Sequence, residues 1–203
     1  MSNSKTFSGE LPVDYQAILH WRIAERASRI LFMNLLSIPL AFVFGIFFFL
    51  FIRVFGKPPE IMPVDSIQTV VLLIGILMVF ALHEVTHGIV MRFFGAQPKY
   101  GFIWKGLMFY ATAPDYAFLR NQYLVVSLAP LVSLSILACF GILIQTGTSN
   151  VWLWAAWATI NGSGTIGDLW IIAITLRYPK YAYIIDERDG IRVFLPQSEA
   201  RMK

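Results

Sequence analysis

Residues 66–94 are apolar enough to cross a lipid bilayer, yet they contain the motif His83-Glu84-Val85-Thr86-His87. A helix needs about 20 predominantly apolar residues to span about 30 Å of hydrocarbon, and this stretch is long enough. A charged group at membrane depth costs at least about 2.5 kcal/mol on insertion scales. We therefore expect a helix in the membrane whose Glu84 performs a function there.

The motif has the spacing of a zinc site. Two histidines four residues apart share one face of a helix and can ligate the same ion, while the glutamate between them can act as a general base. We predict that His83 and His87 ligate zinc and that Glu84 is catalytic.

Composition indicates a membrane protein. The chain is 57% hydrophobic and 14% charged with a mean hydropathy of +0.65, whereas about 25% of the residues in soluble domains are charged. The net charge of +4 does not indicate nucleic-acid binding, because Lys and Arg lie between the apolar runs. Cys139 is the only cysteine, which excludes a disulfide framework and predicts a packed thiol.

Four apolar runs predict an all-α integral membrane protein with four transmembrane helices. The first covers residues 30–52, and the second begins after Asp65, which can cap it together with Gln68. The third and fourth lie within residues 121–176 and are joined by a turn at 147–150. We expect three parts: an amphipathic N-terminal segment (1–29), a four-helix membrane metallopeptidase domain (30–176) and a cytoplasmic tail (177–203).

Charge predicts the orientation and adds a third ligand. With four helices, 14 of the 16 Lys and Arg residues lie on one side, so both termini are expected in the cytoplasm and the protein in the cell membrane. The second and fourth helices then run in the same direction. His83 lies nine residues before Arg92 and Asp168 nine before Arg177, which places them at similar depth.

Asp168 is therefore predicted as the third protein ligand of one Zn²⁺ ion per chain. Three protein ligands leave a fourth position for water, as in hydrolytic zinc sites. Zinc lowers the pKa of such a water from 15.7 to about 7, and Glu84 would take its proton during attack on a carbonyl.

The segment from Asn161 to Asp168 contains three glycines, which predict a break in the fourth helix at the site. We predict that Asn161 is catalytic and donates to the substrate carbonyl or the oxyanion. The alternative is that Asn161 caps a half-helix and the glycines allow close helix packing.

These residues resemble a known family. The sequences HEVTHG, RFFGAQPKYGF and YATAPDYAFLRNQYLVVSLAP, with residues 161–168, are similar to a domain family of unknown function described as zincin membrane peptidases. More distantly, the arrangement is similar to site-2 proteases, which carry HExxH on one transmembrane helix and an aspartate ligand on a later one. The resemblance covers about residues 66–176. It implies an intramembrane zinc metalloprotease with ligands His83, His87 and Asp168 and Glu84 as base. The chain lacks the proline-rich stretch of site-2 proteases before the aspartate, and Leu169 replaces their following glycine.

Three segments outside the helices have predicted structures. Residues 99–104 and 107–112 are aromatic-rich and predict a β-hairpin, which would either pair with an extended substrate or anchor the loop at the membrane interface. Residues 12–29 have apolar side chains at helical spacing and are expected to lie along the inner membrane surface. Residues 181–186 and 191–195 predict a cytoplasmic C-terminal hairpin.

The function expected from these patterns is hydrolysis of peptide bonds in membrane-embedded or membrane-proximal proteins. The partners are then a membrane protein or peptide substrate and the bilayer, without nucleic acid. Two alternatives remain open: a non-catalytic, metal-containing membrane chaperone that binds clients, and a small metal transporter that uses the same ligands and the broken helix.

Overall fold

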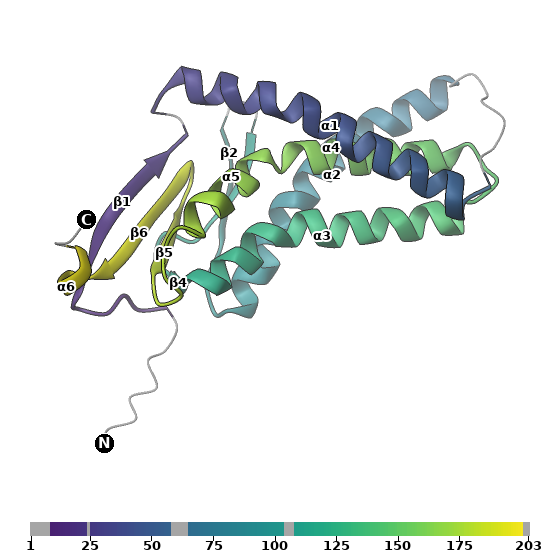
Figure 1. Cartoon of the computed structure of the whole chain (residues 1–203). Coiled ribbons are helices and arrows are strands. Elements are labelled where there is room, and N and C mark those ends of the chain that lie inside the picture. The colour runs from purple at the N-terminus through teal and green to yellow at the C-terminus, as the bar shows by residue number, and fades with distance from the viewer. Residues whose placement is uncertain (1–8, 24, 58–64, 104–107, 201–203) are drawn as a thin grey trace. The chain divides into compact units, whose positions relative to one another are not determined.

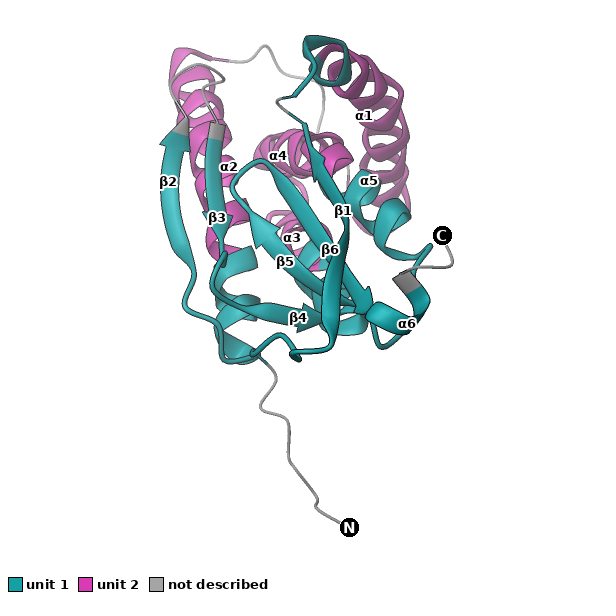
Figure 2. Cartoon of the chain, turned by 90° about the vertical axis from the view of Figure 1, so that its left-hand side faces the viewer, with its two compact units in different colours: residues 1–30, 87–128, 168–203 teal, residues 31–86, 129–167 magenta. Residues whose placement is uncertain are grey.

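The computed structural model describes residues 9–23, 25–57, 65–103 and 108–200, which form helices and two small sheets (Figure 1). The chain divides into two compact units (Figure 2). Unit 1 contains residues 1–30, 87–128 and 168–203, and unit 2 contains residues 31–86 and 129–167.

Three helices are long and apolar enough to cross a membrane. They are α1 (Ala27–Phe55), α2 (Ser66–Phe93) and α3 (Arg120–Ile144). Large apolar side chains such as Phe42, Leu77 and Ile136 are exposed along them, as expected for helices whose neighbours are lipid. The first three predicted helices are therefore confirmed as long apolar helices, and their insertion in a membrane stays a prediction.

Helix α2 begins and ends where its terminal residues predict. The Asp65 side chain accepts the Gln68 N–H at 2.6 Å, and the Gln68 side chain accepts the Asp65 N–H at 3.4 Å, which completes a capping box. At the other end, Gly95 has a φ of 97° and donates its N–H to Arg92. These two ends determine how far along the helix the histidines lie.

The last apolar stretch forms two shorter helices, α4 (Asn150–Gly164) and α5 (Ile166–Thr175). Thr165 separates them, and its N–H and hydroxyl donate to the carbonyls of Asn161 and Gly162 at the end of α4. The predicted break is confirmed. Neither helix belongs to the three candidate spans among the described residues, so a fourth crossing stays a prediction.

Unit 1 contains an antiparallel four-stranded sheet in the order β1-β6-β5-β4 (Figure 2). Strands β5 (Tyr183–Glu187) and β6 (Gly190–Pro196) form the predicted C-terminal hairpin, and β4 (Ala117–Leu119) pairs with β5. The short helix α6 (Gln197–Ala200) follows. The fold is thus mostly helical with two small sheets. Both hairpins were predicted, but their class was given as all-α, and the extension of the C-terminal hairpin by β1 and β4 was missed.

The helical interpretation of the N-terminal segment was also wrong. Strand β1 (Tyr15–Arg22) pairs with β6 from Tyr15 opposite Pro196 to Arg22 opposite Gly190. The β5–β6 hairpin would otherwise leave the edge of β6 without a backbone partner, and β1 satisfies that edge. Tertiary pairing therefore overrides the local helical spacing.

The predicted hairpin after α2 is confirmed as β2 (Lys99–Ile103) and β3 (Met108–Thr112), a separate two-stranded sheet. Phe102 and Phe109 lie opposite each other with ring centroids 4.9 Å apart. The predicted turn at 105–106 lies outside the described residues.

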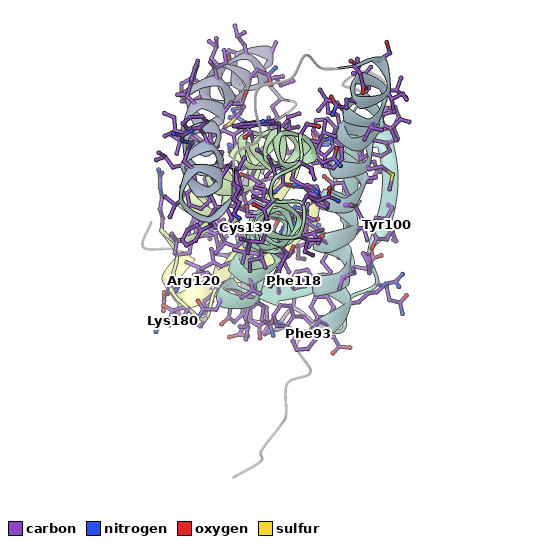
Figure 3. All side chains as sticks on the ribbon, turned by 90° about the vertical axis from the view of Figure 1, so that its right-hand side faces the viewer. Phe93, Tyr100, Phe118, Arg120, Cys139 and Lys180 are labelled. Atoms are coloured by element: carbon purple, nitrogen blue, oxygen red, sulfur yellow. The ribbon has the colours of Figure 1, made fainter. Side chains whose placement is uncertain are left out.

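The start of α3 is tied to the segment before β5. The Arg120 N–H donates to the Ala182 carbonyl at 2.9 Å, and its guanidinium donates to the Tyr178 carbonyl at 2.8 Å. Arg120 and the nearby Lys180 are labelled in Figure 3. This anchor sets the position of the first turns of α3 within unit 1.

Unit 2 has its own apolar core, built from α1, α3 and α4 around Phe48, Ile52 and Ile142. Cys139 is a free thiol packed against this core, as predicted. Helices α2 and α4 also lie in close contact. Gly75 lets the Trp157 ring approach α2, and the indole N–H of Trp157 donates to the Leu72 carbonyl.

We predict that Gly75→Ala destabilises the protein by about 1–3 kcal/mol, because the added methyl would lie 2.1 Å from the Trp157 ring. The measurement is thermal unfolding of the purified protein in detergent. Gly45→Ala in α1 is the matched control, since its methyl would meet Thr159 at an ordinary 3.8 Å. Equal stability of the two variants would contradict the packing argument.

Candidate metal centre

His87 lies on α2 in unit 1 and is held by hydrogen bonding. Its side chain is buried, and Nδ1 lies 2.9 Å from the Val126 carbonyl oxygen on α3. A carbonyl oxygen can only accept, so Nδ1 carries the hydrogen and Nε2 is the nitrogen able to ligate a metal. Nε2 lies 3.3 Å from an oxygen of Asp168, in the first turn of α5.

His83 lies one helical turn earlier on α2, in unit 2. Its Nδ1 is 3.1 Å from Asn161 Oδ1, and Asn161 Nδ2 donates to the Pro130 carbonyl at 3.3 Å. The Pro130 carbonyl can accept a hydrogen bond only from the amide nitrogen of Asn161. The amide oxygen of Asn161 therefore faces His83. His83 therefore donates from Nδ1 and also has Nε2 as its ligating nitrogen.

His83, His87 and Asp168 form a group that can hold a metal ion, since one ligand atom from each lies within 4.8 Å of the others. Two neutral imidazoles and a carboxylate suit zinc and leave a coordination position open. Zinc-bound histidines usually donate their other ring N–H to an oxygen, as both Nδ1 atoms do here. The donor set of this chain thus fits the predicted zinc ion.

The structure also places the two other predicted site residues. Glu84 follows His83 on α2 and is half-buried. Asn161 is 2% exposed in the last turns of α4, and both ends of its amide are hydrogen-bonded. The catalytic roles of Glu84 and Asn161 stay predictions.

A buried acid and phenol near this site were missed in the sequence. Tyr123, on α3, donates to Asp186 of β5 at 2.5 Å, and Thr112 of β3 donates to the Asp186 backbone carbonyl at 3.1 Å. Asp186 belongs to the C-terminal hairpin, where its sequence neighbourhood carries no sign of catalysis. Only the folding of unit 1 brings these three elements together.

Burial raises the pKa of Asp186 to about 6, and the hydrogen bond from Tyr123 lowers that pKa only in part. The pKa of this carboxyl is thus higher in the folded chain than its usual value of 3.8. The resulting contribution to stability is fully present below about pH 3.8 and is lost as the pH rises through about 6.

We predict that Asp186→Asn, which keeps an acceptor for Tyr123, gains stability relative to wild type as the pH rises from 4 to 7.5. The expected change in the difference between the two proteins is about 3 kcal/mol. It is measured by unfolding in detergent with a chelator present, so that no metal contributes. A difference that does not vary with pH would contradict the assignment.

An HExxH helix with a later aspartate ligand defines a metal site of the zincin class. A family model described as "Putative zincin peptidase" matches residues 76–183, more than half of the chain, and the protein belongs to this family. The match includes His83, Glu84, His87 and Asp168. No curated protein and no solved structure matches the chain.

Proposed function

We propose that this protein is an intramembrane zinc metalloprotease that hydrolyses peptide bonds of membrane-embedded or membrane-proximal substrates. The observation that carries the proposal is the grouping of His83, His87 and Asp168 within 4.8 Å, two of them on a helix apolar enough to span a membrane. Membership in the zincin peptidase family supports the same chemistry.

Each predicted site residue has its own role in this mechanism. His83 and His87 present Nε2 and Asp168 presents a carboxylate oxygen as ligands. Zinc, when bound, supplies a Lewis acid that polarises the substrate carbonyl and acidifies a water molecule. Glu84 accepts the proton of the attacking water and delivers it to the leaving amine.

The hydrogen bonds of Asn161 limit how it could act on a substrate. A donor to the substrate oxyanion would have to come from Nδ2, which donates to the Pro130 carbonyl in this structure. The nitrogen carries two hydrogens, so direct action of Asn161 on the substrate would use the one that does not donate to Pro130.

The proposal includes a topology for the chain in the membrane. We infer that α4 and α5 together make the fourth crossing, with both termini in the cytoplasm, because 14 of the 16 Lys and Arg residues then face that side. The break at Thr165 is tolerable in a membrane because the Thr165 N–H and hydroxyl hydrogen-bond locally.

Strand β2 pairs only with β3 among the described residues, so the hairpin has an edge to which an extended substrate can add.

We predict that the purified wild type contains about one zinc per chain and that His87→Ala and Asp168→Ala lose most of it, since each removes one of three protein ligands. Metal content is measured by mass spectrometry. His20→Ala is the matched control, because His20 pairs with Glu187 outside the metal group and its loss should not change the zinc content. A folded wild type that binds no zinc would contradict the hydrolase chemistry.

We predict that Glu84→Gln keeps zinc but abolishes cleavage, because glutamine cannot accept the proton. Membranes from cells that produce either protein are compared for fragments, and intact substrates are sought among the proteins that co-purify with the variant. Asp115→Asn is the control, since Asp115 is exposed and paired with Lys99. Retained cleavage in Glu84→Gln would exclude this mechanism, and intact clients bound by the wild type would favour a chaperone.

A further inference from the structure

Pro130 lies inside α3, where it changes the backbone hydrogen bonding of the helix. In an α-helix, residue i+4 donates its N–H to the carbonyl of residue i, and proline has no N–H to donate. The Val126 carbonyl, four residues before Pro130, therefore receives no helix bond from position 130. This is the carbonyl that accepts the Nδ1 hydrogen of His87 at 2.9 Å.

The carbonyl of Pro130 acts on the other histidine. It accepts Asn161 Nδ2 at 3.3 Å and so determines which way the amide faces. The amide oxygen then lies 3.1 Å from His83 Nδ1. One proline is thus linked to both histidines, to His87 through a carbonyl that it leaves open and to His83 through Asn161.

We propose that Pro130 is a positioning residue of the metal centre, which keeps the Val126 carbonyl available to His87 and, through Asn161, holds His83 with Nε2 toward the metal. This inference rests on the proposed zinc site. Loss of such outer partners commonly weakens metal binding by about 10- to 100-fold. A proline inside a helix lowers the stability of that helix. In this proposal, Pro130 lowers the stability of α3 and in return holds the metal ligands in position.

The chain supplies a matched control. Pro39 also lies inside a long apolar helix, α1, which carries no member of the His83, His87 and Asp168 group. Replacement of either proline restores a backbone N–H to a helix. Only at position 130 does the restored N–H face a carbonyl that holds a candidate ligand.

The test is Pro130→Ala in the full chain, with zinc affinity measured by chelator competition and the stability of the metal-free protein measured by thermal unfolding. The new N–H competes with His87 for the Val126 carbonyl. We expect zinc affinity to fall about tenfold or more, while the metal-free protein is as stable as wild type or more so. Pro39→Ala should leave zinc affinity unchanged.

Two substitutions of Asn161 test its contact with His83, which is the last step of the second link. Asn161→Asp keeps an acceptor for His83 Nδ1 and should retain most of the zinc affinity, whereas Asn161→Leu removes it and should weaken zinc binding about tenfold or more. An Asn161 that acts only on the substrate oxyanion would leave zinc affinity the same in both variants, so that result overturns this link.

The outcomes separate this inference from the proposed function. Tight zinc binding by wild type with the same affinity in Pro130→Ala overturns the positioning role and leaves the protease proposal intact. A loss of affinity that accompanies a loss of metal-free stability, or that also occurs in Pro39→Ala, overturns it as well. Wild type without zinc affinity overturns the proposed function and this inference together.

Discussion

A polar side chain packed among apolar groups must find hydrogen-bond partners, because an unpaired polar group there costs free energy. Helix α2 brings His83 and His87 into such surroundings, and the rest of the site follows from how the two rings are satisfied. Each Nδ1 meets an oxygen, from Val126 or from Asn161, and each Nε2 remains for metal ligation. A backbone carbonyl of α3 and the Asn161 amide of α4 are therefore as much a part of the candidate centre as the motif itself.

Much of the site was predictable because its signals are local. The spacing of His83 and His87 requires only a helix, and the capping residues at Asp65 and Gly95 are read directly from the sequence. Asp168 was found by a depth argument, from equal distances to Arg92 in the last turn of α2 and to Arg177 just after α5. The structure places Asp168 3.3 Å from His87, as similar depths along the two helices predict.

The remainder depends on contacts between distant segments, which leave no local pattern. Strand β1 has helical spacing and becomes a strand because β6 presents an unpaired edge. Asp186 is an ordinary residue of a C-terminal strand until Tyr123 and Thr112 surround it. Pro130 could be seen in the sequence, but its effect on Val126 mattered only once His87 was found beside that carbonyl.

The pairing of β1 with β6 joins residues near positions 15 and 196, almost the whole length of the chain apart. Strand β1 is synthesised before the three long helices and β6 after them, so this pairing can form only when all of them have been made. Unit 1 can close only after β6 has been translated. His87 and Asp168 both belong to that unit, so two of the three candidate ligands lie in the unit whose sheet joins the earliest and the latest described strands.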